Sequence, residues 1–231
     1  MAQTGRAADD LTQVMDVLKR TLTALPVPTE PLQMILWENI GYLADDPRRR
    51  DLFDTFETTV GLDPAAILGA DEAMLLTLAR RGGMRPDTRV ERWREIARIV
   101  LSLCYSDLNR TLRPLPLAKA RTLLKIFPVT ADPGADKILL FSGIAVRPSL
   151  ESNGLRALAR LGFLKEQSSH NRSYRAGIEV LVEGGRPDQE WLFDAHVLLR
   201  ELGKTTCRRG EPLCAACPVD PICAHATVSV L

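Results

Sequence analysis

The apolar residues follow a helical spacing along nearly the whole chain. Leu11, Val14 and Leu18 recur at intervals of three and four, and the segment 90–100 repeats the same pattern. The alternation of Val, Ile, Thr and aromatic residues that marks a half-buried strand is almost absent. The sequence therefore predicts an all-α fold.

Proline and glycine divide this helical pattern into short pieces. The proline-rich segment 25–31 is expected to end the first helix, and Pro64 directly after an aspartate is expected to begin another. Gly82 and Gly83, followed by Pro86, separate the next pair of helices. We therefore expect many short helices rather than a few long ones.

The composition excludes several classes of protein. With 231 residues, 45% apolar and 26% charged, the chain is neither disordered nor collagen-like and can bury a core without covalent cross-links. The residues after Met1 do not form a signal peptide, and no run of about 18 apolar residues occurs. We expect a cytoplasmic protein with no membrane partner.

The net charge is only +1, but the charges are unevenly distributed. Residues 1–79 sum to −7, whereas residues 80–125 sum to +8 and residues 137–175 to +5. Two basic blocks of this kind are typical of a surface that contacts nucleic-acid phosphates. Solvated helix faces would give the same sums, so charge by itself leaves both interpretations open.

Four of the five cysteines lie within the last 25 residues: Cys207, Cys214, Cys217 and Cys223. In a reducing compartment such clustering favours a metal over disulfides. Four thiolates can hold either zinc or a [4Fe-4S] cluster. One Cys-x2-Cys pair bracketed by single cysteines favours the cluster, with zinc as the alternative, whereas Cys104 is expected to be a buried thiol.

This spacing, after a helix that runs from Ala195 towards the first cysteine, resembles the iron-sulfur branch of the endonuclease III-like helix-hairpin-helix DNA glycosylases. The resemblance implies two helical domains with a cleft between them. A barrel domain would span 32–147, and a cluster domain would combine 1–31 with 148–231, its cluster loop lying at 207–223. Arg208 and Arg209 would then contact DNA phosphates.

A second resemblance lies in the segment 127–137, which is similar to that superfamily's hairpin. It implies that the backbone at Ala131 and Gly134, together with Lys137, contacts a DNA phosphate. Val129 and Ala131 replace the two hairpin glycines, so we expect positive φ angles to be costly there.

The residues that follow the hairpin admit a different interpretation. Asp132 followed by Pro133 predicts an N-cap and a first helical residue. An ordinary capped helix over 133–145 and a phosphate-binding hairpin both remain possible, because an N-cap carboxylate would occupy the N–H groups that a phosphate needs.

The resemblance also locates two catalytic positions. Pro133 matches the Schiff-base lysine of lyase members and has no amine, which predicts a monofunctional enzyme. Glu151 matches the catalytic aspartate, five residues before Arg156, which we expect to bind DNA. A carboxylate there would stabilise the oxocarbenium-like sugar formed when an N-glycosidic bond breaks. Alternatively, Glu151 only favours the first turn of a helix over 151–161.

Glu38 is the second candidate catalytic residue. It lies in an almost wholly apolar segment, so we expect burial to raise its pKa and make it a proton donor. The adenine-removing branch of the superfamily keeps a catalytic glutamate at a similar place. An edge position, or an ion pair with an arginine at 48–50, is the alternative.

Together these features predict a monomeric, monofunctional base-excision DNA glycosylase that acts on double-stranded DNA containing a damaged or mispaired base. The alternative is a non-catalytic iron-sulfur protein that binds or senses damaged DNA on the same scaffold.

Overall fold

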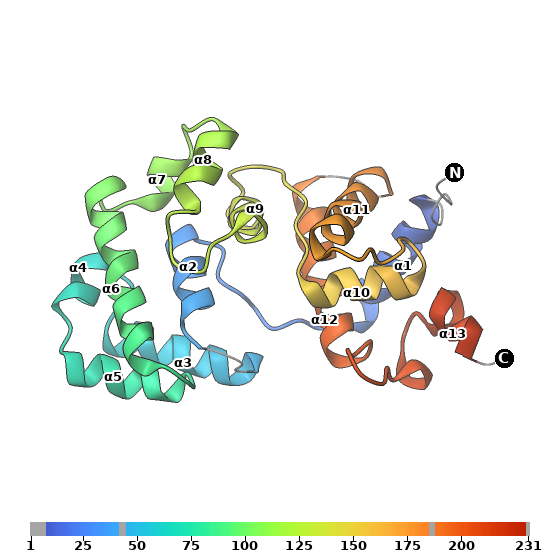
Figure 1. Ribbon diagram of the computed structural model, residues 1–231, viewed down its shortest axis with the longest axis horizontal. Coiled ribbons are helices and arrows are strands. Elements are labelled where there is room, and N and C mark those ends of the chain that lie inside the picture. Colours follow the sequence, from blue (N-terminus) through green and yellow to red (C-terminus); the bar gives the residue numbers. More distant parts are fainter. Residues whose placement is uncertain (1–7, 42–44, 185–187, 230–231) are drawn as a thin grey trace. The chain divides into compact units, whose positions relative to one another are not determined.

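The computed structural model describes residues 8–41, 45–184 and 188–229, and every regular element in those ranges is a helix (Figure 1). The all-α fold predicted from the sequence is confirmed. The chain divides into two compact units, one made of residues 25–145 and the other of the chain before and after them. From the sequence we expect the corresponding boundaries at 32 and 147.

Eight of the described helices belong to the first unit: α2 (Pro31–Asn39), α3 (Asp46–Thr59), α4 (Pro64–Gly69), α5 (Glu72–Arg81), α6 (Pro86–Leu103), α7 (Leu108–Leu112), α8 (Leu117–Leu124) and α9 (Asp132–Phe141). Several of these helices have an acidic residue at the N-cap, whose side chain accepts hydrogen bonds from the first turn. The Asp63 carboxylate accepts from the N–H groups of Ala65 and Ala66, and Pro64 fixes the first helical residue, as the sequence predicts.

The core of this unit forms around α6. Trp93, in the middle of that helix, is fully buried and packs edge-to-face on Phe56 of α3, with ring centroids 4.8 Å apart. Its indole Nε1–H donates to the carbonyl oxygen of Asn39 at the end of α2, at 3.2 Å. Trp93 thus connects three helices, and the one polar atom of its side chain is hydrogen-bonded.

The second unit contains α1 (Ala8–Thr21), α10 (Ser152–Leu161), α11 (His170–Glu183), α12 (Gln189–Thr205) and α13 (Ala224–Ser229), together with the 3-10 turns η1 (Cys214–Ala216) and η2 (Asp220–Ile222). Its most extensive helix pair is α10 against α12. A Cβ on Gly203 of α12 would overlap the backbone of Asn153 in α10. Glycine is therefore needed for this close approach.

Cys104 lies at the end of α6 and is completely buried, as the sequence predicts. Burial raises the pKa of its thiol because the thiolate would lose its hydration. None of the described helices combines the length and the apolarity needed to cross a membrane.

Candidate functional site

The hairpin between α8 and α9 keeps a left-handed turn without glycine. Val129 has a φ of 65° and its side chain is 61% exposed. The preceding carbonyl, of Pro128, accepts from the Asn39 amide at 3.1 Å, which holds the turn against α2. The positive φ that the sequence marks as costly is therefore adopted at Val129, whereas Ala131 has a φ of −100°.

The beginning of α9 differs from the sequence-based prediction. The N-cap residue is Ala131, which makes no side-chain cap hydrogen bond, so the prediction that Asp132 is the N-cap is wrong. The Asp132 carboxylate instead pairs with Lys125 at 3.0 Å and Arg121 at 3.2 Å. The hydrogen bond from Lys125 lowers the pKa of this carboxyl group. No side-chain carboxylate caps the first turn of α9, the turn that contains Gly134.

Glu38 and Lys137 form a direct ion pair in the same unit. Lys137 Nζ lies 2.6 Å from Glu38 Oε1, and Arg49 Nη1 lies 3.9 Å from Glu38 Oε2. The Glu38 side chain is 37% exposed although most of α2 is buried, so the expected burial of this glutamate is wrong. The Lys137 ammonium also lies 5.5 Å from the ring centroid of Phe141.

Glu151 caps the N-terminus of α10. Its Oε1 accepts from the backbone N–H groups of Asn153 at 2.7 Å and Gly154 at 2.9 Å, and its Oε2 accepts from the Asn153 amide at 2.9 Å. The first-turn interaction considered from the sequence is therefore present. The same three donors fix the position of the carboxylate, which a catalytic role would also require.

Arg156 continues this set of contacts along α10. It donates to the Asn153 side-chain oxygen at 2.8 Å, to the Gly203 carbonyl and to the Cys207 carbonyl at 3.1 Å. Burial lowers the pKa of this guanidinium. These hydrogen bonds join Glu151 through Asn153 and Arg156 to the first cysteine.

The four clustered cysteines line one small hollow whose exposed wall is apolar. Burial raises the pKa of the Cys214 and Cys217 thiols. Among the described residues, no three His, Cys, Asp or Glu side chains are placed to hold a single metal ion. Four sulfur donors around one apolar hollow do fit a thiolate-bound cluster.

Arg160 fixes the start of the cysteine loop. Its guanidinium lies 3.6 Å from Cys207 Sγ and donates to the carbonyls of Arg208 at 2.6 Å and Arg209 at 3.3 Å. With those carbonyls held, the Arg208 and Arg209 side chains remain exposed. Arg160 was not predicted from the sequence, although it lies one helical turn after Arg156 on the same face of α10.

A buried polar pair holds the chain just before Glu151. The Ser149 hydroxyl and His196 Nδ1 are 2.8 Å apart, and both residues are buried. The pair attaches the segment that enters α10 to α12. No spacing in the sequence signals it, because the two residues are 47 positions apart.

Beside the cysteine loop lies a wide hollow of about 1740 Å³ between α10 and α11. Arg156, Arg160 and Arg209 contribute to its lining, whereas Glu179 and Glu183 contribute acidic groups from α11. The mixed charge does not favour a polyanion over other ligands, and we assign no ligand to it.

Comparison with known structures shows that this chain shares the fold of endonuclease III. Endonuclease III trapped in a covalent complex with DNA matches with a TM-score of 0.74 and 14% identity, covering 98% of this chain and 100% of that one. A non-covalent endonuclease III–DNA complex matches with a TM-score of 0.75 and 13% identity, covering 97% and 99%.

A thermostable thymine-DNA glycosylase matches with a TM-score of 0.73 and 13% identity, covering 94% of this chain and 95% of its own. No protein-family model and no curated protein matches the sequence. What the chain shares with these structures is the fold.

Proposed function

We propose that this protein is a DNA glycosylase that hydrolyses the N-glycosidic bond of a damaged or mispaired base in double-stranded DNA. The observation that supports this most strongly is the Glu151 carboxylate, which three donors hold at the N-terminus of α10. Breaking the bond builds positive charge on the sugar, and a fixed carboxylate stabilises that charge or orients the attacking water.

The reaction is expected to stop at base removal. Pro133 lies where a Schiff-base lysine would be needed and offers no amine. Lys137, one turn further along α9, is paired with Glu38 at 2.6 Å. We therefore propose a monofunctional enzyme, with Glu38 as the second candidate catalytic residue.

Contacts to the DNA backbone would come from both units. In the first unit, the start of α9 at Ala131 and Gly134 has no side-chain cap, and its N–H groups attract an anion. In the second, Arg208 and Arg209 are exposed on the cysteine loop. Lys137 and Arg156 complete the proposed set, although Arg156 acts chiefly through its contacts within the protein.

The four clustered cysteines would hold a [4Fe-4S] cluster, with zinc as the alternative. Such a cluster supplies a structural cross-link and one-electron redox chemistry when bound. The chain's own contribution is Arg160, which orders the loop by donating to two of its carbonyls.

A non-catalytic protein that senses DNA damage is the second candidate function. The hairpin favours it, because Val129, Ala131 and Pro133 replace the two glycines and the lysine of the superfamily's hairpin. Such a protein would bind damaged duplexes tightly without releasing a base.

Excision assays on a panel of lesion-containing duplexes separate the two functions. We expect one lesion to be released by the wild-type protein and not by Glu151→Gln, which loses the charge but keeps an oxygen that can cap α10. Glu57→Gln, an exposed change on α3, is the matched control and should retain activity. Tight binding with no release across the panel would favour the sensor.

A further inference from the structure

The polar side chains of Ser149 and His196 are buried although neither has a part in the proposed chemistry. Ser149 is fully buried, His196 is 2% exposed, and the Ser149 hydroxyl lies 2.8 Å from His196 Nδ1. Burying polar groups costs free energy that two apolar side chains of similar shape would not. A satisfied polar pair can, however, specify one geometry where apolar packing allows several.

Ser149 presents two oxygens to the same ring nitrogen. Its hydroxyl lies 2.8 Å and its carbonyl oxygen 3.1 Å from His196 Nδ1. The carbonyl can only accept, so it pairs with a protonated Nδ1, whereas the hydroxyl can donate to an unprotonated one. Either tautomer of the imidazole therefore has a partner on Ser149. Because one of these oxygens belongs to the main chain, the contact fixes the path of the backbone as well as a side chain.

Helix α12 holds the chain on both sides of Glu151. Before it, Ser149 contacts His196, and after it, the Asn153 backbone lies so close to Gly203 that a Cβ there would overlap it. His196 and Gly203 are two helical turns apart and lie on the same face of α12. Glu151 lies midway between residues 149 and 153, so two points on one helix determine where its backbone runs.

Apolar packing covers the residue between the pair and Glu151. Leu150 is 2% exposed, and a Cβ on Gly177 of α11 would lie 2.9 Å from its Cδ1. A Cβ on Gly154 of α10 would lie 3.5 Å from its Cδ2. Hydrophobic contact has no preferred direction, whereas a hydrogen bond has a preferred angle. Leu150 therefore excludes water from the segment, and the pair of Ser149 and His196 orients it.

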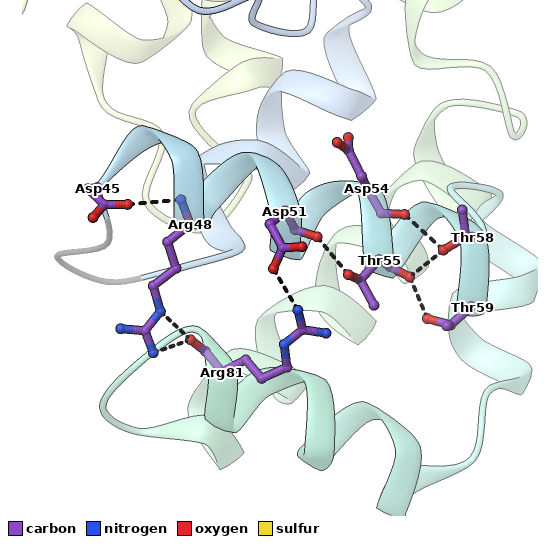
Figure 2. A network of polar contacts seen from close by, with 8 residues as sticks. All are labelled: Asp45, Arg48, Asp51, Asp54, Thr55, Thr58, Thr59 and Arg81. Atoms are coloured by element: carbon purple, nitrogen blue, oxygen red, sulfur yellow. Dashed lines mark hydrogen bonds and ion pairs between the residues drawn. The ribbon is translucent and has the colours of Figure 1, made fainter.

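Other polar contacts of the protein are open to water. In the network that Figure 2 shows, Arg48 donates to the Arg81 carbonyl at 2.7 Å, and the Arg81 side chain pairs with Asp51 at 2.7 Å. The two side chains of that ion pair are 44% and 68% exposed. Exposed pairs contribute little, because water and salt compete for them. The buried pair of Ser149 and His196 has no such competition.

We propose that His196 is a positioning residue that orients the Glu151 carboxylate through Ser149. The inference rests on the proposed function and adds to it a residue that never touches the carboxylate. His196 acts through the backbone between residues 149 and 151. A catalytic group misplaced by about an ångström can lose roughly a hundredfold in rate, while DNA contacts made elsewhere in the protein remain.

The test uses the full chain and single-turnover excision on the lesion that the panel identifies. The key variant combines Ser149→Ala with His196→Leu, which removes both polar partners and leaves neither unsatisfied, so the unfolding midpoint should stay close to that of the wild type. We expect the excision rate constant to fall roughly hundredfold and the dissociation constant of the duplex to stay unchanged. A merely structural role would leave the rate intact.

Rescue by a conservative variant separates orientation from packing. His196→Asn keeps a polar atom at the position of Nδ1, because the asparagine amide is also attached at Cγ. We expect it to restore most of the rate, although it fills the space less well than leucine. If the stable variant with leucine is as fast as His196→Asn, packing and not hydrogen bonding holds the segment.

Hydrogen exchange gives a measurement that needs no activity. The N–H groups of Asn153 and Gly154 donate to the Glu151 carboxylate at 2.7 and 2.9 Å. We expect them to exchange roughly tenfold faster in the variant that lacks both polar partners, the change that the loss of one N-cap interaction would give.

Ser173→Ala is the matched control, because it removes another buried serine hydroxyl from the same unit. Ser173 is 4% exposed and accepts from the Gln167 N–H at 2.8 Å, away from Glu151. The excision rate and the exchange of Asn153 and Gly154 should both match the wild type in this variant.

The outcomes separate this inference from the function on which it rests. If the variant that lacks both polar partners keeps the wild-type excision rate, or the wild-type exchange at Asn153 and Gly154, His196 does not position Glu151. If the wild type releases no base from any duplex of the panel, the proposed function fails and the inference fails with it. Faster exchange in the variant would then show only that the pair orders the cap of α10.

Discussion

The hairpin of the first unit and the segment from Glu151 to the cysteine loop of the second fix their geometry in two different ways. The hairpin keeps its left-handed turn with different residues, since Val129 adopts a φ of 65° without glycine. The Glu151 segment is fixed by side chains, since the Glu151 carboxylate accepts from the Asn153 N–H and Arg156 donates to the Asn153 side-chain oxygen. A backbone conformation can thus be adopted by a residue that is strained in it, whereas side-chain chemistry requires particular residue types.

The largest expected effect concerns the cysteine loop. We expect the purified protein to be brown, with broad visible absorbance that bleaches on reduction, and Cys214→Ala to lose that absorbance completely because one of four ligands is gone. Cys104→Ala, a change at a buried thiol outside the loop, should keep it. If the wild-type protein is colourless and contains one zinc per chain, the cysteines hold zinc and not an iron-sulfur cluster.

A large effect on stability is expected at Gly203. Gly203→Ala should lower the free energy of unfolding by about 1–3 kcal/mol, because its Cβ overlaps the Asn153 backbone and separates α10 from α12. Urea unfolding measures this. Gly210→Ala, which meets nothing within 4 Å, should change stability far less. Equal effects of the two variants would contradict the close approach.

Relief of strain in the hairpin is expected to be a smaller effect of opposite sign. Val129→Gly should raise the free energy of unfolding by about 0.5–1 kcal/mol, because the gain in an unstrained left-handed turn exceeds the entropy that glycine loses on folding. Val146→Gly, at an exposed valine without positive φ, should lower stability by about 0.5 kcal/mol. A loss of stability in both would show that Val129 is not strained.

The smallest effect is expected at Asp132, whose pKa is lowered by the hydrogen bond from Lys125. A lowered folded-state pKa means that the stabilisation is present above the unfolded value and is lost as the pH falls through the folded value. Asp132→Asn should therefore cost roughly 0.5 kcal/mol or less at pH 7, and the difference from wild type should shrink below about pH 4.

Salt provides the control for this exposed pair. Added salt should reduce the cost of Asp132→Asn at pH 7, because exposed charges are screened. A difference that persists unchanged at low pH and in salt would mean that Asp132 stabilises the hairpin through packing rather than charge.

The sequence predicted what depends on local pattern. Helical spacing gave the all-α class, and Pro64 and Cys104 lie in the structure as expected, since caps and apolar runs act over a few residues. The N-cap of α9 was predicted wrongly. Asp132 has competing cations at 121 and 125, which single-residue preferences cannot reveal.

The candidate site was harder to predict from the sequence, because its contacts join residues that lie far apart along the chain. Glu38 was expected to be buried but is partly exposed, and its ion-pair partner Lys137 is 99 residues away in the sequence. The hydrogen bond between Ser149 and His196 likewise joins residues 47 positions apart. Such geometry follows from tertiary packing, which periodicity does not specify.

Single-turnover excision on the lesion that the panel identifies is the sharpest test of the proposal that Glu151 serves base excision without strand cleavage. We predict that the wild-type protein releases the base, that strands break only after alkali treatment, and that Glu151→Gln abolishes release while still binding the duplex. Full release by Glu151→Gln, or strand cleavage without alkali together with a borohydride-trapped protein–DNA adduct, would contradict the account.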